Sequence, residues 1–376
     1  MIGVAYKTLV HDWQRFVPAV MAVGFAGVLL AVQAALVLGI FGSAAVYVNT
    51  SSADLWVGHP GTQSVNFGSA IGPDVATRLR LDPDVRRVEP YVWVDGEWRG
   101  STYGGTLSVY VSGIETGSDG LLFDRLLTPA QRRQLDEPGA VIVDHAELGQ
   151  LDAGPDGIAS INGQRVRIVG SVRGLRGLGG VNIIASQYTA RWLSHDSDEQ
   201  DSTYFLVQLR KGADAHTVRD RVSVAGSFGA YTVWTAEEFA RTSQRYWLLD
   251  TGAGVAVMFM AVVVLVVGAV TTSQSLMGMV AGSAREYAVL NALGVSRFSL
   301  GRIVLAQSCW VGGLGLVVAA LGSTGLLYLA AAYDVPVAMT LSMALMCMTL
   351  VASVAVLSGV VALRGLLRAD PALLLR

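Results

Sequence analysis

Residues 16–48 read FVPAVMAVGFAGVLLAVQAALVLGIFGSAAVYV and contain no charged side chain. About 20 apolar residues of helix cross a bilayer, so this run is long enough to span a membrane and to project beyond it as a stalk. A cleaved signal peptide is the alternative, but its apolar part is only about 7–15 residues long. Apolar runs at 248–275, 303–332 and 338–363 are also long enough to cross. The sequence therefore predicts four transmembrane helices.

Charged residues gather between the first and second apolar runs. The whole chain is 52% hydrophobic and 15% charged, whereas an average soluble domain has about 25% charged residues. Residues 49–245 hold 19 Lys/Arg and 24 Asp/Glu, and the rest of the chain holds 8 and 5. One polar domain is therefore expected to interrupt a membrane protein. A nucleic-acid binder is not expected, because the net charge is −2 and no basic tract occurs.

Positive charges near the spans predict the orientation, because short loops rich in Lys and Arg resist transfer across a membrane. They lie before the first span, between the second and third, and after the fourth: Lys7, Arg15, Arg285, Arg297, Arg302, Arg364, Arg368 and Arg376. The loop between the third and fourth spans has none. Both termini are predicted to be cytoplasmic. The aromatic residues expected at the outer membrane boundary are Tyr47, Tyr246, Trp247, Tyr328 and Tyr333.

These features divide the chain into nine predicted segments. They are a cytoplasmic amphipathic segment (1–15), transmembrane helix 1 with its stalk (16–48), a periplasmic domain (49–245), a stalk with transmembrane helix 2 (246–277), a cytoplasmic coupling segment (278–302), transmembrane helix 3 (303–332), a short periplasmic loop (333–337), transmembrane helix 4 (338–363) and a cytoplasmic tail (364–376). The first and second helices are expected to be long and continuous, so that they can carry rigid-body motion across the bilayer.

A stripe of small residues runs along the first span, each four positions after the last: Gly27, Ala31, Ala35, Gly39 and Ser43. Residues at this spacing share one helix face, and small side chains there let a second backbone approach closely. The stripe predicts a packing interface. Its partner is either another helix of the same chain or a second subunit.

The polar domain alternates short strands with brief helices. Strand patterns at 54–57 and 88–94 flank a helix pattern at 73–81, and the same order recurs at 204–209, 213–224 and 230–234, before a helix at 235–245. Strand patterns at 106–114, 140–144, 164–172 and 181–185 lie between the two units. The predicted fold is an α-helical membrane protein whose α+β periplasmic domain has two β-α-β units bracketing a small β lobe.

A glycine-rich segment at 173–180, RGLRGLGG, lies inside the predicted β lobe. It lacks the GxGxxG order of a dinucleotide-binding loop, so a phosphate cradle is not expected. The simplest interpretation is a mobile surface loop. A contact with an adaptor protein or a gate around an opening is the alternative, and Arg173, Arg176, Gly177 and Gly179 are its candidate residues.

The search for catalytic, cofactor-binding or metal-ligating residues predicts none. The five histidines are dispersed, and the acidic loop at 196–201 lacks the spacing of a calcium-binding EF-hand. Cys309 and Cys347 lie in apolar runs, where a thiol packs as a small hydrophobe. A Walker A loop needs Gly-Lys-Ser/Thr, and Lys7 and Lys211 both lie in other contexts. If ATP is consumed, a separate polypeptide is expected to hydrolyse it.

The segment at 285–296, REYAVLNALGVS, is predicted to form a short amphipathic helix that ends at a glycine. Such a helix either lies on the lipid surface or inserts into a groove of a soluble partner. Its candidate coupling residues are Arg285, Glu286, Tyr287, Val289, Leu290, Leu293 and Gly294.

This segment resembles the R-E-[hydrophobic]-x-[hydrophobic]-L-[K/R]-A-[hydrophobic]-G-[A/V]-[S/T] motif of FtsX-like permeases, the MacB-type (type VII) ABC transporter superfamily. The ending at 368–376, RADPALLLR, resembles the family's R-x-D-P-x-x-x-L-R. One span, a large domain and three further spans is also the family's layout, and ADLWV at 53–57 looks most like the DevC branch. Two features depart from the pattern: Asn291 replaces a basic residue, and no ATPase domain is fused as it is in MacB.

The resemblance implies an inner-membrane homodimer that binds two copies of a separate ATPase, which holds the ATP and magnesium. It also implies a periplasmic HlyD-like membrane-fusion adaptor, an outer-membrane channel, and export by mechanotransmission in a tripartite efflux complex. Glu286 and Leu290 would be the leading contacts of the coupling helix. Regulation of cell-wall hydrolases, as by FtsX itself, and lipoprotein extraction, as by LolC/LolE-like members, are the alternatives.

Overall fold

The computed structural model describes residues 13–100, 105–152, 157–194, 201–224, 231–282, 297–333 and 335–368. The chain folds into two compact units, with boundaries after Gly39 and after Gly254. We call residues 40–254 the inserted domain and the remainder the membrane unit. Each unit has its own packing and is described separately.

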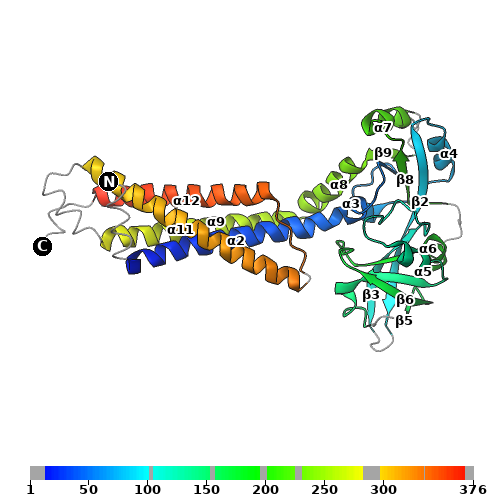
Figure 1. The fold of residues 1–376 in the computed structure, drawn as a ribbon, viewed down its shortest axis with the longest axis horizontal. Coiled ribbons are helices and arrows are strands. Elements are labelled where there is room, and N and C mark those ends of the chain that lie inside the picture. The colour runs from blue at the N-terminus through cyan, green and yellow to red at the C-terminus, as the bar shows by residue number, and fades with distance from the viewer. Residues whose placement is uncertain are drawn as a thin grey trace. The chain divides into compact units, whose positions relative to one another are not determined.

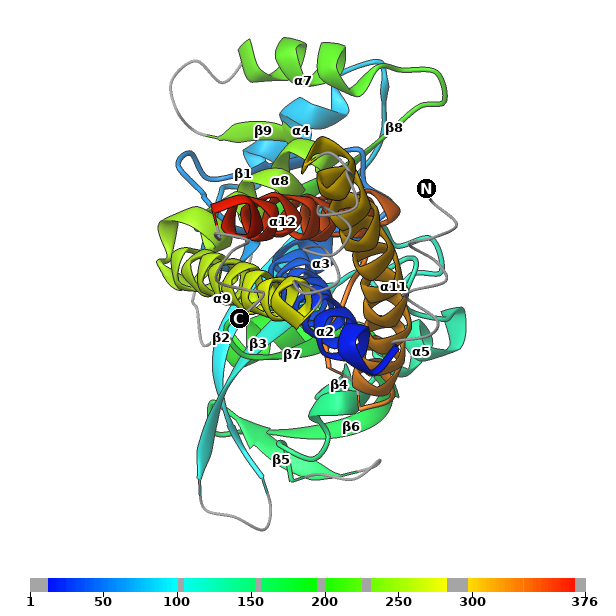
Figure 2. The same ribbon diagram turned by 90° about the vertical axis from the view of Figure 1, so that its left-hand side faces the viewer.

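The membrane unit consists of four long apolar helices: α2 (Trp13–Gly42), α9 (Ala253–Gly282), α11 (Arg297–Ala332) and α12 (Leu341–Arg368). Each contains a stretch long and apolar enough to cross a membrane. Figures 1 and 2 show them side by side. Large apolar side chains are exposed on them, such as Phe259 at 67% and Leu321 at 71%, as expected for surfaces that contact lipid. The prediction of four transmembrane helices is confirmed.

The helix that enters the inserted domain continues to Asn49 with a local change of winding, whereas the helix that leaves the domain is interrupted. After α2 the chain forms a 3₁₀ turn, η1 (Ser43–Ala45), and then α3 (Val46–Asn49). On the return path, α8 (Ala236–Arg245) is followed by a π-helical turn, η4 (Tyr246–Asp250), before α9 begins. Gly252 has φ +74°, a left-handed conformation that ends a helix. The expectation of a continuous second helix is therefore wrong, because this glycine interrupts it.

One half of the inserted domain is a four-stranded sheet with two β-α-β units. The units are β1 (Leu55–Gly58), α4 (Asp74–Arg80) and β2 (Val85–Arg99), and β8 (Tyr204–Leu209), α7 (Ala215–Val224) and β9 (Thr232–Thr235). The strand order is β9-β1-β8-β2, and β1 is antiparallel to both β8 and β9. The two units are thus interleaved in one sheet, as in a split β-α-β fold.

The other half is a closed barrel. Its further strands are β3 (Thr106–Ile114), β4 (Ala140–Asp144), β5 (Ile158–Ile161), β6 (Gln164–Val172) and β7 (Val181–Ser186). The pairings run β2-β3-β7-β4-β6-β5 and return to β2 at Trp98 and Arg99, so these strands leave no free edge. Two helices accompany the barrel, α5 (Pro129–Gln134) and α6 (Gln187–Ser194). The predicted β lobe between two β-α-β units is confirmed.

Strand β2 belongs to both halves of the inserted domain (Figure 1). Its residues 85–91 pair with β8 in the split sheet, and its residues 92–99 pair with β3 in the barrel. A single long strand therefore ties the two halves together, and a packed core fills the space where they meet.

Candidate functional site

The predicted coupling helix lies outside the described residues, which omit 283–296 and everything after 368. The structure does describe the place where the chain passes from α2 into the inserted domain. We call the buried cluster around α3 the junction core. Its members come from both chain connections and from both halves of the domain, and they include Tyr47, Trp56, Tyr91, Ile114, Phe123, Ile142, Leu175, Ile184, Tyr204 and Phe239.

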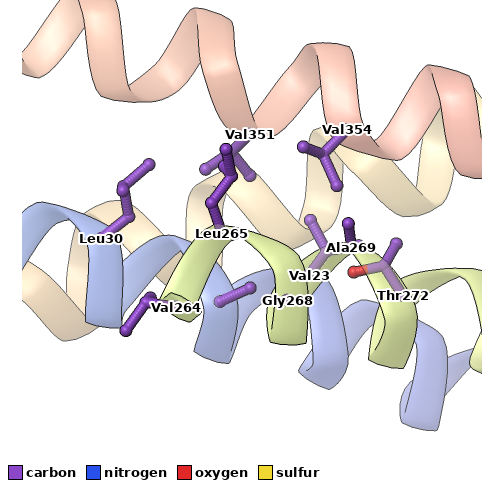
Figure 3. Close-up of a pocket in the computed structure, with 10 residues that line it drawn as sticks. Val23, Leu30, Val264, Leu265, Gly268, Ala269, Thr272, Val351 and Val354 are labelled. Atoms are coloured by element: carbon purple, nitrogen blue, oxygen red, sulfur yellow. The ribbon is translucent and has the colours of Figure 1, made fainter. Parts of the chain in front are cut away.

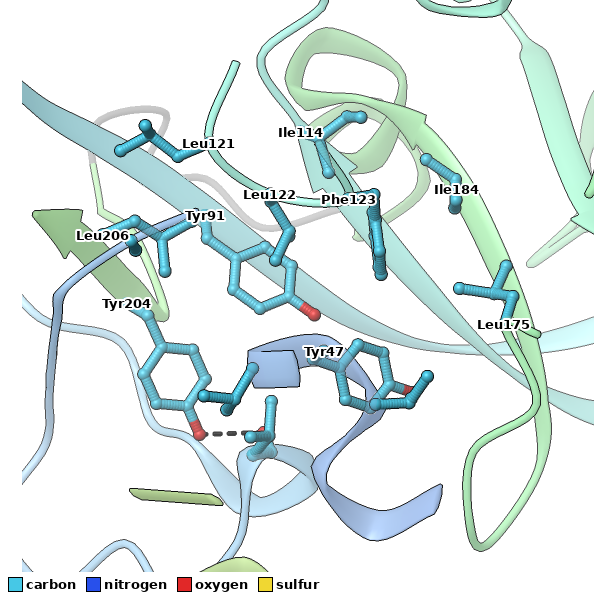
Figure 4. Close-up of a cluster of buried hydrophobic side chains, with 14 of the residues drawn as sticks. Tyr47, Tyr91, Ile114, Leu121, Leu122, Phe123, Leu175, Ile184, Tyr204 and Leu206 are labelled. Carbon is cyan, nitrogen blue, oxygen red and sulfur yellow. Dashed lines mark hydrogen bonds between the residues drawn. The ribbon is translucent and has the colours of Figure 1, made fainter. Parts of the chain in front are cut away.

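The short helix α3 is enclosed by this core (Figure 4). Tyr47 is 0% exposed, and its ring lies 5.1 Å from that of Trp93 in an edge-to-face arrangement. The returning helix α8 packs against η1 and α3 and contributes Phe239. The expectation that Tyr47 lies at the membrane boundary is wrong, because its side chain is buried in protein. The two connections to the membrane helices therefore meet inside one packed cluster.

A hydrogen-bonded chain connects Tyr47 to the barrel. The Tyr47 hydroxyl donates to Asn182 Oδ1, and Asn182 Nδ2 donates to the Leu175 carbonyl over 3.0 Å. The Leu175 N–H donates to Asp144 Oδ2 over 2.7 Å, and the Asn182 N–H donates to Glu147 Oε2 over 3.3 Å. Each of these four partners is at most 4% exposed. Hydrogen bonds in such a dry environment fix side-chain orientation, so α3 is held in one position against strands β4 and β7.

The glycine-rich loop at 173–180 lies against this chain. A Cβ on Gly177 would lie 3.0 Å from the Tyr47 hydroxyl, and Gly179, with φ +99°, lies against Tyr110. Asn66 Nδ2 donates to the Leu178 carbonyl over 2.7 Å. Arg173 is exposed and Arg176 is partly buried. The loop is therefore anchored to the junction core, which disfavours a freely mobile loop. Whether its exposed side contacts an adaptor stays a prediction.

The segment at 119–125 holds the opposite side of α3. The Ser52 N–H donates to the Leu121 carbonyl over 2.9 Å. Arg125 donates from its backbone N–H to the Thr50 carbonyl over 3.3 Å and from Nη1 to the Asn49 carbonyl over 3.2 Å. These bonds satisfy carbonyls at the end of a helix that would otherwise lack partners.

Arg132 of α5 holds the segment at 119–125 in place through hydrogen bonds to carbonyl groups in and before it. Its guanidinium is in a side chain only 2% exposed, and it donates to the carbonyls of Glu115, Gly120 and Leu122 over 2.9, 3.1 and 2.5 Å. Arg87 adds an ion pair to Glu115 over 3.0 Å. Charged donors to several carbonyls hold a loop more firmly than neutral ones. The segment at 119–125, which bonds to the end of α3, is thus itself held in place.

Two buried carboxyl groups, those of Glu89 and Glu147, accept hydrogen bonds from residues that lie next to α3. Burial raises the pKa of Glu89 to about 7, although its Oε2 accepts the Leu121 N–H over 2.6 Å. Burial also raises the pKa of Glu147 to about 7, although Oε2 accepts the Asn182 N–H. Glu89 Oε1 has no hydrogen-bond partner within the described residues. Both groups therefore change charge in the physiological pH range.

The small-residue stripe of α2 contacts other parts of the same chain. A Cβ on Gly27 would lie 2.6 Å from that of Ala319 on α11, and the Ala35 carbonyl accepts the Ala338 N–H over 3.0 Å. Ala31 lines an apolar cavity of about 190 Å³ between α2, α11 and α12. Ser43 is partly buried and donates to the Ile40 carbonyl over 2.6 Å. The stripe is thus occupied within one chain, at least from Gly27 to Gly39.

Another face of α2 packs against α9 and α12 through apolar side chains (Figure 3). The space that remains between them is about 20 Å³, lined by Val23 and Leu30 of α2, Val264, Gly268 and Thr272 of α9, and Val351 of α12. A cavity this small holds no more than one water molecule. The three helices therefore form a closely packed group.

Gly39 offers a direct test of this packing. A Cβ there would clash with the Pro336 carbonyl and lie 2.7 Å from Val337 Cα, whereas a Cβ on Gly42 would meet nothing within 4 Å. We expect Gly39→Ala to destabilise the purified chain by about 1–3 kcal/mol. The matched variant Gly42→Ala should be neutral or slightly stabilising, because alanine favours helix. Thermal unfolding in detergent measures both, and equal shifts would contradict the described packing.

A comparison with protein-family models supports the resemblance to FtsX-like permeases that the sequence motifs predicted. Residues 258–371 match the FtsX-like permease C-terminal model. No curated protein sequence matches the chain. Among the described residues, no group of three His, Cys, Asp or Glu side chains could hold a metal ion.

Three solved structures are similar to about half of the chain. The periplasmic region of MacB from Actinobacillus actinomycetemcomitans has a TM-score of 0.38 at 13% identity and covers 52% of this chain and 94% of its own. The extracellular domain of YknZ, a noncanonic ABC-type transporter from Gram-positive bacteria, has 0.35 at 13%, with 49% and 100% covered. A domain of a putative permease protein from Porphyromonas gingivalis has 0.34 at 9%, with 50% and 92% covered.

The chain is a multi-pass membrane protein with four apolar helices and a mixed α/β domain between the first and second. Its residues 258–371 are similar to the C-terminal part of FtsX-like permeases, the family that its sequence motifs resemble. Permeases of this family are generally the non-catalytic subunits of their assemblies. The DevC branch stays a prediction.

Proposed function

We propose that this chain is the permease subunit of an ABC export complex and transmits motion from a separate ATPase to the inserted domain. The observation that carries the proposal is the junction core. Both connections to the membrane helices, α3 and α8, are packed into one cluster with strands of both halves of the domain. Motion that enters through either helix must displace this cluster as a unit, because closely packed interiors transmit strain.

The rest of the proposed assembly is the one that the resemblance to FtsX-like permeases implies. In this proposal two copies of the chain form a homodimer in the bacterial inner membrane with both termini in the cytoplasm. Two copies of a partner ATPase bind ATP and magnesium and contact residues 285–294. The inserted domain lies in the periplasm, where it binds a HlyD-like adaptor connected to an outer-membrane channel. The fixed position of the loop at 173–180 supports its assignment as the adaptor contact, since a firmly held surface binds at less entropic cost.

The test compares two single hydroxyl deletions. Tyr47→Phe removes the buried bond to Asn182, and Tyr110→Phe removes the exposed bond to the Gly179 carbonyl at 3.3 Å. In the complex purified with its ATPase and reconstituted into vesicles, export per ATP hydrolysed should fall severalfold for Tyr47→Phe and stay unchanged for Tyr110→Phe. The reason is that a link lost from a buried network loosens α3 without unfolding the domain. Equal coupling ratios in both variants would contradict the proposal, and so would the absence of any ATPase that binds the chain.

A further inference from the structure

An aromatic cluster lies on the inserted domain and includes residues that come shortly before the second membrane helix in the sequence. Phe67, at the end of the turn η2 (Val65–Phe67), packs against two residues of η4 that are far away in the sequence. Its ring lies 5.4 Å from that of Tyr246 and 6.0 Å from that of Trp247, and the latter two rings are 5.9 Å apart. Trp247 Nε1 donates a hydrogen bond to Ser64 Oγ over 3.1 Å.

The turn at 64–68 is held so that Phe67 points away from the core. Ser64 and Val65 are 0% exposed, whereas Phe67 is 51% exposed. The Tyr204 hydroxyl donates to the Val65 carbonyl over 2.8 Å, and a Cβ on Gly68 would clash with that same hydroxyl. The turn therefore presents the Phe67 ring at a fixed position on the surface of the inserted domain.

The cluster lies close in the chain to a helix that is long and apolar enough to cross a membrane. Only residues 248–252 separate Trp247 from Ala253, the first residue of a membrane-spanning helix. Tyr and Trp are enriched at the boundary between lipid and water, where the ring meets acyl chains and the polar tip meets headgroups. Leu249 of the same turn is 46% exposed. The exposed apolar surface is thus continuous along the chain with the part that contacts the bilayer.

We propose that Phe67, Tyr246 and Trp247 form an aromatic anchor in the headgroup boundary of the leaflet that faces the inserted domain. Tyr246 and Trp247 occupy the boundary because they precede the span. Phe67 enters it because its turn is fixed to them by ring contacts and by the Ser64 bond. The split sheet, through Tyr204, is thereby tied to the lipid surface at a point other than its helical connections. The proposal does not depend on which side of the membrane the domain lies.

The experiment places an environment-sensitive fluorophore on single cysteines of the full chain, in a Cys309→Ser, Cys347→Ala background. One variant is Phe67→Cys. The matched control is Leu81→Cys, which follows α4 and is 79% exposed. The protein is reconstituted into phosphatidylethanolamine and phosphatidylglycerol vesicles, with or without a lipid that carries a nitroxide near its glycerol. A third variant, Leu249→Cys, reports the boundary at η4 itself.

We expect the nitroxide lipid to quench the labels at 67 and 249 about twofold or more, and to leave the label at 81 unchanged. Quenching at 249 but not at 67 would overturn the proposal, because the turn at 64–68 would then not contact the lipid. Equal quenching at 67 and 81 would also overturn it. A disulfide between two copies at position 67 without quenching would show that a second chain, and not lipid, covers the cluster.

Discussion

Replacing Tyr47 with alanine is expected to destabilise the inserted domain by about 3–5 kcal/mol, as large-to-small changes of buried aromatic residues do. The ring is fully buried between Trp93 and Phe123, whose centroids lie 5.1 and 6.1 Å from its own. The neighbours are fixed by strands and by the segment at 119–125, so the cavity cannot close easily. The change also leaves Asn182 Oδ1 without its donor in a dry site, which adds to the cost.

The control separates the ring from the hydroxyl. Tyr47→Phe keeps the ring and loses one hydrogen bond, so its cost should be about 1 kcal/mol. Residues 40–254 form a compact unit with their own cores, so denaturant unfolding of this segment can measure both variants once circular dichroism shows that it folds. If alanine and phenylalanine destabilise equally, the ring makes no net contribution and the junction core is not tightly packed.

Local patterns predicted most elements of the inserted domain but not how they pair. The strands at 106–114, 140–144, 164–172 and 204–209 have the bounds predicted, because alternation and turn residues mark strand ends. The short strand β5 and helices α5 and α6 were missed. Thr128 and Gln131 form a capping box that could have revealed α5. Interleaving of the β-α-β units and barrel closure depend on contacts between distant residues, which periodicity does not encode.

The site was harder to predict than the fold, for a similar reason. Tyr47 ends an apolar run, so a boundary position was expected, but its burial is set by Asn182 and Trp93 far along the chain. Asn182, Glu147 and Arg132 were missed, since polar residues among short elements show no pattern. Glu89 did carry a signal: it is the single carboxylate within the otherwise apolar stretch VEPYVWV at 88–94, and such a residue is buried or paired.

Raising the pH from 4.5 to 8 is expected to destabilise the inserted domain through Glu89 and Glu147. Both carboxyls have a pKa raised to about 7 by burial, against an ordinary value of 4.5. Between these values the folded state binds more protons than the unfolded state, so stability falls as pH rises. The contribution is fully present below 4.5 and is lost through 7. A shift of this size corresponds to about 3 kcal/mol for each group.

The charged groups around each carboxyl determine the net shift of its pKa. Glu89 is faced by Arg87 at 3.8 Å, which favours its charged form, and by Glu115, which opposes it. Glu147 is faced by Asp144, which raises its pKa, and by Arg176, which lowers it. Burial outweighs these opposing charges at both sites, because neither carboxyl is more than 4% exposed. The net direction is therefore the same for both.

Matched amide variants test this pH dependence. Glu89→Gln and Glu147→Gln keep an acceptor for the Leu121 and Asn182 N–H groups but cannot ionise, so each should flatten the fall in stability between pH 5 and 8 by about half. The measurement is the free energy of unfolding of residues 40–254 at several pH values. If the wild type and the double variant show the same slope, the carboxyls do not titrate in the folded domain. If the expected slope is found, ionisation of two groups that bond to the neighbours of α3 loosens the junction core as the surroundings become alkaline.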